Sequence, residues 1–402
     1  MPHRTTFIAG DENMSDFKRI YADNAATTQC SVAAIRAMTP YFYESYGNPS
    51  SLHSYGQEAA NALAQAREII AQAIGGQPQE VFFTASGTES DNQAIISAAR
   101  FGARKNKRHI ISSAIEHHAV LHTLDALEKE GWEITLLPVD EYGLITPEQV
   151  KNAIREDTAL VSVMLANNEI GTIQPIGEIA AICRESGVIC HTDAVQAMGH
   201  IPVNAADLGI DMLSLSGHKI HGPKGAGVLW CRRGIPLTSI IHGGAQERGK
   251  RAGTENIPAI VGTAVALEEA VTHCDSNASF VRELRDLLID GLSEIPASRL
   301  NGHPTKRLPG NTSFCFEGVE GESMLLLLDQ NGICASSGSA CTSGSLEPSH
   351  VLLALGLPHE IAHGSLRLSL SADNTREEID HIIKVLPPII QRLRDMSPLW
   401  RK

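Results

Sequence analysis

The sequence predicts an α/β protein in which a large, mostly parallel sheet is followed by a smaller α+β domain. Between residues 58 and 231, segments with helical periodicity alternate with short apolar segments, as in a parallel sheet covered by helices on both faces. After about residue 260, long helical stretches precede short strands and a Gly/Ser-rich loop. The 402 residues suffice for about two or three domains with well-buried cores.

The first helix of this alternation has Leu63, Ala66, Ile70 and Ile74 on one face, and the pair Gly75-Gly76 supplies the glycine that commonly ends a helix. The strands expected after it cover residues 81–84, 109–112, 132–139, 160–165, 188–191, 212–215 and 227–231. The helices expected between and after them cover residues 119–130, 176–186, 258–273, 278–292 and 376–395.

This pattern divides the chain into two expected domains. Residues 20–260 form the large one, and residues 261–402 form the small one. We expect the N-terminal segment, residues 1–30, to pack on the small domain.

Composition excludes several classes of protein. The formal charge is −13, from 33 basic and 46 acidic side chains, which argues against a nucleic-acid or anionic-membrane binder. The longest apolar segments, residues 159–166 and 324–328, fall well short of a membrane span. Eight scattered cysteines form no disulfide framework, and the first twenty residues show no secretory signal. We therefore expect a cytoplasmic protein with reduced thiols.

Residues 83–90 join the end of a predicted strand to the start of a helix near Thr88. The free N–H groups at a helix N-terminus bind anions well, so this turn is a candidate phosphate site. The same residues also read as a capping box of Ser86 with Glu89, which needs no ligand. Both interpretations stay open.

A lysine follows the strand predicted at residues 212–215. Lys219 lies among hydroxyl, glycine and histidine residues, which suits a Schiff-base lysine, whereas a solvated loop charge is the better interpretation of Lys224. A pyridoxal phosphate site also needs an acid for the ring nitrogen, and Asp193 stands at the end of an apolar strand. In open α/β sheets ligands bind at the carboxyl ends of strands, where we expect Asp193, Lys219 and residues 86–88 to meet.

Small polar residues surround Cys341 in the segment 335–345. In a polar, flexible loop a thiol stays exposed, where it can ionise, attack and swing between two positions. A linker with an incidental cysteine is the alternative. The other interpretation of cysteine, as a small core residue, fits Cys183, Cys190, Cys231 and Cys315.

Histidines need separate attention, because the chain has 17 of them. The segment Glu116-His117-His118 follows a predicted strand. One of its histidines could supply an aromatic ring and proton carrier over a cofactor; alternatively, both are loop residues whose hydrogen bonds are satisfied locally. Zinc competes for the histidines and cysteines, but we expect no CxxC, HxxxH or HExxH spacing to support it and therefore no structural metal. The basic Gly-rich loop at residues 242–254 either binds phosphate, from the same or another subunit, or is a solvated charge run.

Together these segments resemble the pyridoxal-phosphate-dependent cysteine desulfurases of the NifS/IscS type. The resemblance extends from about residue 20 to 400, in order and with compatible spacing. Its motifs are residues 21–28, 47–51, 87–90, 167–169, 191–196, 216–219, 248–254 and 336–348. The segment 336–351 and the ending at residues 397–400 are most similar to the nitrogen-fixation NifS branch.

The resemblance implies the fold-type I transferase fold and a homodimer with active sites near the subunit boundary. It implies that Lys219 holds pyridoxal phosphate covalently, that Asp193 pairs with the pyridine nitrogen, that Gln196 contacts the phenolic oxygen and that His117 stacks on the ring. The residues that it assigns to the phosphate are Gly87, Thr88, Ser216, Gly217 and His218, with Thr254 from the other subunit.

The implied substrate is L-cysteine. Asn168, also a cofactor contact, and Arg367 would orient it, with Arg367 offering a bidentate fork to its carboxylate. Asn24 is a further candidate for that pocket. The expected catalytic residues are Lys219, His117 and Cys341.

The implied reaction yields L-alanine. Lys219 would remove the Cα proton, and the Cys341 thiolate would attack the substrate sulfur and keep it as a persulfide. The sulfur would pass to an iron–sulfur scaffold of the NifU/IscU type, for nitrogenase clusters, with Cys341 as a transient cluster ligand. Two departures from the family are residues 1–18, which have no counterpart, and the ending at Lys402, which lacks the longer tail of housekeeping relatives.

Three alternatives compete with this interpretation. A selenocysteine lyase would have similar parts. A class V aminotransferase would not need Cys341 in a mobile loop. A sulfur-relay or scaffold-binding protein would keep the pyridoxal phosphate site only as a vestige.

Overall fold

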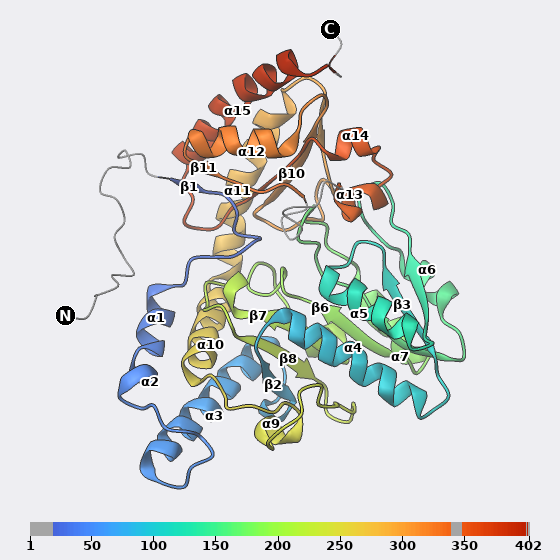
Figure 1. The fold of residues 1–402 in the computed structure, drawn as a ribbon, viewed down its shortest axis with the longest axis vertical. Coiled ribbons are helices and arrows are strands. Elements are labelled where there is room, and N and C mark those ends of the chain that lie inside the picture. Colours follow the sequence, from blue (N-terminus) through green and yellow to red (C-terminus); the bar gives the residue numbers. More distant parts are fainter. Residues whose placement is uncertain (1–18, 339–347, 399, 401–402) are drawn as a thin grey trace, which may run out of the picture.

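The computed structural model describes residues 19–338, 348–398 and 400. Its larger part is built on a seven-stranded sheet (Figure 1). The strands are β2 (Val81–Thr84), β3 (His109–Ser113), β4 (Glu133–Leu137), β5 (Thr158–Ser162), β6 (Ile189–Asp193), β7 (Met212–Ser216) and β8 (Gly227–Cys231), in the order β2-β8-β7-β6-β5-β3-β4. The pairs among β3 to β7 are parallel, and only β8 runs antiparallel to its neighbours β7 and β2. The predicted mostly parallel sheet is confirmed.

Consecutive residues of these strands enter different cores. Ile110 and Leu160 belong to one apolar cluster, while Ile111 and Val161 belong to another. Side chains alternate between the two faces of a strand, so both faces of the sheet are covered. The covering and flanking helices are α1 (Val32–Met38), α2 (Pro40–Tyr43), α3 (Ser54–Ile74), α4 (Gly87–Ala103), α5 (His118–Lys129), α6 (Pro147–Ala153), α7 (Ile176–Glu185), α8 (Ala205–Leu208), α9 (Gln246–Gly249) and α10 (Ile257–Thr272), with single 3₁₀ turns η1 (Pro78–Glu80) and η2 (Gly217–Lys219).

Local sequence explains where these elements end. Gly75 caps α3 in the left-handed region, at φ 78°, which confirms the predicted helix end. The strand expected at residues 160–165 is shifted toward the N-terminus: β5 begins at Thr158 and ends at Ser162. Beyond it Met164 and Leu165 are buried without continuing the strand. An apolar run signals burial more reliably than it signals hydrogen bonding in a sheet.

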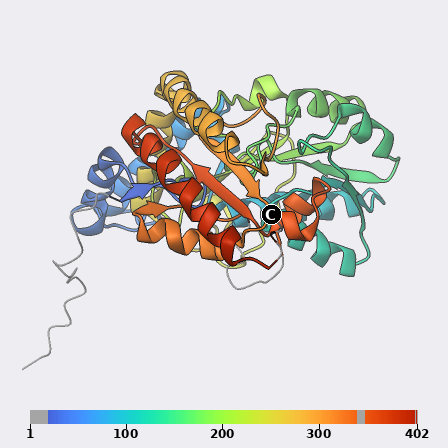
Figure 2. The same ribbon diagram turned by 90° about the horizontal axis from the view of Figure 1, so that it is seen from above.

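The smaller part holds two small sheets. In the first, β10 (Asn311–Phe316) lies between β9 (Ser298–Leu300) and β12 (Ser365–Ser369), all antiparallel. In the second, β1 (Ile20–Tyr21) pairs in parallel with β11 (Ile333–Cys334). The helices are α11 (Cys274–Ser293), α12 (Gly321–Gln330), α13 (His350–Ala354), α14 (His359–Ala362) and α15 (Arg376–Met396). Seen from above, α15 lies across this part of the molecule (Figure 2).

The N-terminal segment bonds to both small sheets of the smaller part. The Ala22 N–H donates to the Cys334 carbonyl at 2.9 Å, and the Ser369 N–H donates to the Ala22 carbonyl at 2.7 Å. These bonds belong to the described portion of the segment 1–30, residues 1–18 lie outside the described ranges, and the packing expected for the whole segment stays a prediction.

The boundary expected at residues 260/261 falls inside α10. Ile260, Ala264 and Leu267 of that helix are buried in the core of the large sheet, whereas Leu284 and Leu288 of α11 belong to the core of the small part. We therefore propose a domain boundary between α10 and α11. None of the helices in the described ranges combines the length and apolar character of a membrane span.

Candidate active site

A cavity of about 360 Å³ lies where the strands of the large sheet end. β2, β6 and β7 run in the same direction, so their carboxyl ends meet at one edge, which is the usual ligand position in open α/β sheets. The small part of the molecule contributes one wall through Arg367 of β12. The lining residues are Ala25, Ala26, Ser86, Gly87, Thr88, Asp91, His117, Met164, Asn168, Asp193, Val195, Gln196, Ser216, His218, Lys219 and Arg367.

Lys219 enters this cavity from the 3₁₀ turn η2, directly after β7. Its Nζ donates to the Ala25 carbonyl at 2.6 Å and to the Ala26 carbonyl at 2.7 Å. Gln196 contacts the same segment, because its Nε2 donates to the Ala25 carbonyl at 2.9 Å. The segment at residues 25–26 therefore positions both side chains.

Asp193 is the last residue of β6, and only 6% of it is exposed. Burial raises the pKa of its carboxyl to about 6, while the hydrogen bond from the Val195 N–H (2.8 Å to Oδ1) and the charge of Lys219 act in the opposite direction. A cation placed beside it would favour the carboxylate further. Asp193 is thus suited to hold a protonated ring nitrogen.

His117 is the N-cap of α5, and its Nδ1 accepts a hydrogen bond from the Ala119 N–H at 3.1 Å. Burial, followed by the charge of Lys219 and then three nearby histidines, lowers the pKa of His117 to about 4. The ring is therefore neutral at pH 7, and because Nδ1 accepts, its proton sits on Nε2.

The N-terminus of α4 forms the end of the cavity suited to an anion. Ser86 caps the helix by accepting from the Glu89 N–H at 3.1 Å, but the Glu89 carboxylate accepts from the Ala85 N–H at 2.9 Å, so only one half of the expected capping box forms. Ser86, Gly87 and Thr88 also line the cavity. The Ser216 Oγ is buried there and has no hydrogen-bond partner among the described residues. His218 contacts the Thr27 hydroxyl at 3.1 Å through Nδ1, and burial lowers its pKa to about 4.

Arg367 is a buried cation, 2% exposed, on the opposite wall. Its Nη2 lies 3.0 Å from the Asp23 carboxylate, and its Nη1 donates to the Asn168 carbonyl at 3.1 Å. Its Nε is buried and has no hydrogen-bond partner within the described ranges. A buried guanidinium with an unused donor is suited to bind a carboxylate.

Three expected site residues within the described ranges do not line the cavity. The Asn24 amide donates to the Ser369 carbonyl at 2.9 Å, so it links the segment after β1 to β12 instead. Gly217 serves packing, because a Cβ there would lie 2.4 Å from the Thr263 hydroxyl. Thr254 is exposed on the loop after α9, and its contribution to a second subunit stays a prediction. Cys341 lies outside the described residues.

Sequence reasoning missed several lining residues, notably Ala25, Asp91 and Met164. Asp91 lies on the second turn of α4, one turn beyond Gly87, so its helical position offered a signal. Ala25 and Met164 carry no chemical signal, since only the fold brings them to the cavity.

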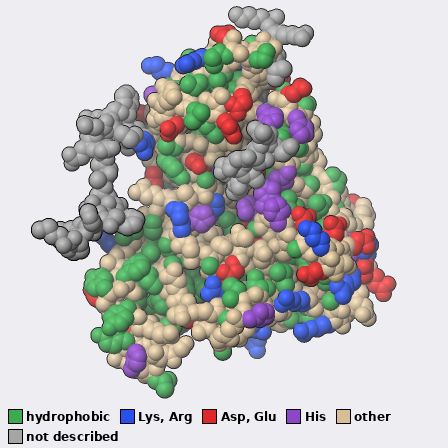
Figure 3. Space-filling view, viewed as in Figure 1, with side chains coloured by type: hydrophobic (Ala, Val, Ile, Leu, Met, Phe, Trp, Pro, Cys, Tyr) green, Lys and Arg blue, Asp and Glu red, His purple; other side chains and the backbone are tan. Residues whose placement is uncertain are grey.

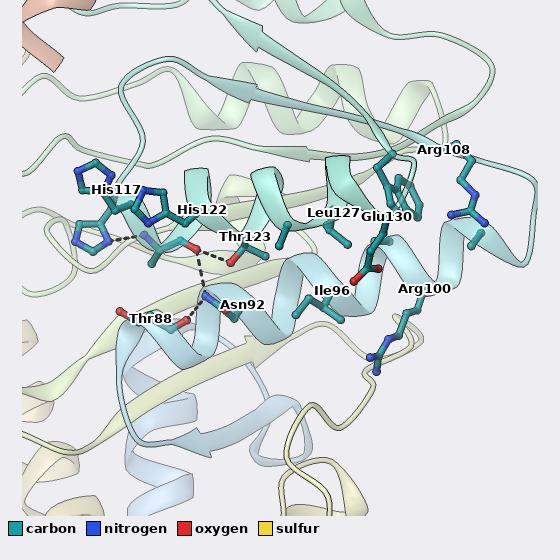
Figure 4. A pocket seen from close by; sticks show the side chains of 16 residues that line it. Thr88, Asn92, Ile96, Arg100, Arg108, His117, His122, Thr123, Leu127 and Glu130 are labelled. Carbon is teal, nitrogen blue, oxygen red and sulfur yellow. Dashed lines mark hydrogen bonds between the residues drawn. The ribbon is translucent and has the colours of Figure 1, made fainter. Parts of the chain in front are cut away.

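A second cavity, of about 580 Å³, lies between α4 and α5 and shares Thr88 and His117 with the first (Figure 4). His118 stacks on His122 with ring centroids 4.8 Å apart, and on its other side lies His350 at 4.7 Å. Histidine side chains also gather near the middle of the surface in Figure 3.

The chain also holds two histidine spacings typical of zinc sites, so spacing does not exclude zinc. His118 and His122 are four residues apart, and residues 359–363 read HExxH, where α14 is a single turn. Throughout residues 19–338, 348–398 and 400, however, no group of three or more His, Cys, Asp or Glu side chains is placed to hold a metal ion.

Comparison with known proteins now identifies the class. The family model "Aminotransferase class-V" matches residues 20–382. Curated relatives include a cysteine desulfurase IscS of Methanosarcina thermophila, 53% identical over 98% of this chain and 97% of its own, and a cysteine desulfurase NifS of Azotobacter vinelandii, 47% identical over 95% of each. A solved NifS-like protein superposes with a TM-score of 0.88 at 39% identity, over 93% of this chain and 100% of its own.

The chain therefore belongs to the class-V aminotransferase family, within its group of pyridoxal-phosphate-dependent cysteine desulfurases. The expected fold type and cofactor are confirmed.

The residues present fit pyridoxal phosphate. The orphaned Ser216 hydroxyl and the helix start at Gly87 suit its phosphate, and a Cβ on Gly87 would intrude to 2.7 Å from Val195 Cγ2. The buried acid Asp193 suits its ring nitrogen, and Lys219 lines the same cavity.

Proposed function

We propose that this protein converts L-cysteine to L-alanine and passes the sulfur to iron–sulfur cluster assembly. The observation that carries the proposal is that Lys219, Asp193 and Arg367 line one cavity of about 360 Å³. The three supply an amine, a buried acid and a carboxylate-binding cation. A related structure, 37% identical with a TM-score of 0.78, is of SspA in complex with cysteine, which supports cysteine as the substrate class.

In this proposal residues at both ends of the cavity would hold the cofactor. Asp193 would hold its ring nitrogen, Gln196 would contact its phenolic oxygen, and the neutral His117 ring would stack on it. The residues that would hold its phosphate are Gly87, Thr88, Ser216 and His218. When bound, pyridoxal phosphate supplies an electron sink for the bond between Cα and its hydrogen.

The chain's own groups then handle the substrate. Arg367 binds the cysteine carboxylate beside Asn168, which fixes the direction of the Cα–H bond. Lys219 Nζ takes the Cα proton and later returns a proton to the product. The small part of the molecule supplies Arg367, so substrate binding spans both domains.

Cys341 is the proposed sulfur acceptor. Its thiolate attacks the substrate sulfur, a sulfur–sulfur bond forms, and the carbon–sulfur bond breaks with its electron pair staying on carbon, which takes a proton to become the alanine methyl group. Cysteine plus thiol thus gives alanine plus persulfide. Ser336, five residues before Cys341 in the sequence, supports the proposal. Its backbone exchanges two hydrogen bonds (2.6 and 3.2 Å) with the backbone of Arg367, which lines the cavity.

Mass spectrometry tests the acceptor directly. After L-cysteine is added to the holoenzyme without reductant, we expect the intact protein to gain the mass of one sulfur atom. The gain should disappear in Cys341→Ser and persist in the control Cys334→Ser, a half-buried thiol seven residues away. Loss of the gain in Cys334→Ser alone would contradict the assignment.

The sulfur then leaves to a partner. We propose a scaffold protein of the NifU/IscU type as acceptor, with Cys341 as a transient cluster ligand during transfer. The narrower destination, nitrogenase clusters, has less support, because the IscS relative is 53% identical and the NifS relative 47%. Transfer from persulfide-loaded enzyme to purified scaffolds of both types distinguishes the two destinations.

We also propose a cytoplasmic homodimer. The seven described cysteines are all unpaired, as expected in a reducing compartment. Apolar side chains gather over α1, α2 and the loop that follows (Figure 3), including Val32, Phe42, Tyr46 and the 92%-exposed Leu52. Exposed apolar patches of this kind mark subunit interfaces. Thr254 of each subunit then completes the phosphate site of the other.

A further inference from the structure

A second buried acid shares the cofactor cavity with Asp193. Asp91 projects from the second turn of α4, lines the same cavity and is 1% exposed. Its Oδ1 is buried and has no hydrogen-bond partner among the described residues. Nothing in the proposed reaction uses it so far.

In the part of the chain that the structure describes, no Lys or Arg forms an ion pair with Asp91. Its ion-pair partner within the described ranges is His191, with Nε2 3.6 Å from Oδ1. Both nitrogens of that ring already contact hydroxyls, Nδ1 that of Ser162 at 2.9 Å and Nε2 that of Ser214 at 3.0 Å. Burial lowers the pKa of His191 to about 3, so the ring is neutral.

Two carboxyl groups in one buried cavity do not both ionise at moderate cost. The surroundings decide which one keeps the proton. Asp193 accepts a backbone hydrogen bond and faces the charge of Lys219, whereas burial raises the pKa of Asp91 well above its usual value. The charges of Asp193 and Glu116 raise it further, and the nearby Ser214 hydroxyl acts in the opposite direction. Such opposite environments assign the charge to Asp193 and the proton to Asp91.

We propose that Asp91 is a positioning residue that acts as a neutral carboxylic acid. Its proton stays within the buried group that Asp91 forms with His191 and Ser214. Asp193 is then the single carboxylate charge that faces the pyridine nitrogen. The inference rests on the proposed placement of that nitrogen at Asp193. A second negative charge would divide the attraction for the pyridine nitrogen between two sites, so the neutral acid fixes where the cofactor ring is held.

Infrared spectroscopy tests the protonation directly. In the difference spectrum of wild type minus Asp91→Asn at about pH 7, we expect one carboxylic-acid band that shifts in D₂O. The exposed control Asp125→Asn should show no such band. A carboxylate band in its place would overturn the proposal, and this readout does not depend on desulfurase activity.

Cofactor binding gives the second test. Because the amide of Asp91→Asn is neutral like the proposed acid, the affinity of the apoprotein for pyridoxal phosphate should stay within about threefold of wild type, and the pH midpoint of the visible absorption band should not move. Asp91→Ala, which removes the buried group, should weaken the affinity about tenfold or more. A moved midpoint in Asp91→Asn would show that Asp91 is ionised and would refute the inference, whether or not Asp91→Ala folds.

Discussion

At the scale of single residues, burial sets the charge of each group in the site. Burial and the charge of Lys219 together keep His117 neutral, whereas burial raises the pKa of Asp193 to about 6 against the charge of Lys219. The residue types at these positions could be predicted from the sequence, because an amine after a strand and an acid at a strand end have a chemical signal. The role of Asp91 could not be predicted, because it depends on a second carboxyl group, that of Asp193, in the same cavity.

Lys219 is expected to be indispensable as a proton carrier. Lys219→Arg keeps the positive charge but removes a group able to accept a proton, so kcat should fall by about 100- to 10,000-fold. The exposed Lys224 offers a control five residues away, and Lys224→Ala should retain activity within about threefold. Alanine release measures both variants. Equal losses in the two would contradict the role given to Lys219.

Asp193 predicts a dependence of cofactor affinity on pH. Its pKa of about 6 in the described protein lies above the usual value of 3.8, so the carboxylate is lost as the pH falls through 6. The affinity of the apoprotein for pyridoxal phosphate should therefore drop below pH 6, by at most about tenfold per pH unit.

The control for this experiment is Asp193→Asn, which has no carboxylate to lose. Its affinity should be low at both pH 7 and pH 5, and any change that it shows reports titration of the cofactor itself. A wild-type affinity that follows the same curve as the variant would refute the pairing of Asp193 with the ring.

At the scale of elements, the site depends on where strands end and helices begin. Alternating apolar segments predicted β2 and β8 to the residue, because turn-forming residues bound them. The end of β5 could not be predicted, since residues 163–166 are as buried as the strand itself while Met164 lines the cavity. Hydrophobic pattern reports burial, and the end of the hydrogen-bonded ladder depends on neighbouring strands.

Gly87 at the start of α4 tests the proposed phosphate site. In Gly87→Ala the new Cβ would lie 2.7 Å from Val195 Cγ2 and 3.4 Å from Ser216 Cβ, so the lining must shift and the cofactor affinity should fall about tenfold or more. Gly177 of α7 is the matched control, because a Cβ there meets nothing within 4 Å. Gly177→Ala should leave the affinity unchanged and keep or raise the free energy of unfolding, by about 0.5–1 kcal/mol. Unchanged affinity in Gly87→Ala would contradict the site.

At the scale of the whole molecule, the cavity belongs to neither domain alone. The large sheet supplies Lys219 and Asp193, β12 supplies Arg367, and residues 22–26 bind both parts. The sequence predicted two domains from the change of texture near residue 260. It could not place the boundary, because the long helices already begin with α10, which packs on the large sheet, whereas α11 after it packs in the small part.

The proposed homodimer predicts a coupling between assembly and cofactor binding. Phe42 is 64% exposed in the apolar patch, so Phe42→Asp should turn dimer into monomer in sedimentation experiments. The monomer should also bind pyridoxal phosphate more weakly, because it lacks Thr254 of the partner subunit. Leu326→Asp, at a leucine of α12 that is 67% exposed, is the control and should remain dimeric. A monomeric wild type would overturn this part of the account.

The most direct test of the central claim is the stoichiometry of products from L-cysteine in the presence of a thiol reductant. Wild-type holoenzyme should release alanine and sulfide in equal amounts, and Cys341→Ser should release neither at a comparable rate. Sulfide without alanine, or full activity in Cys341→Ser, would contradict a desulfurase that carries the sulfur on Cys341.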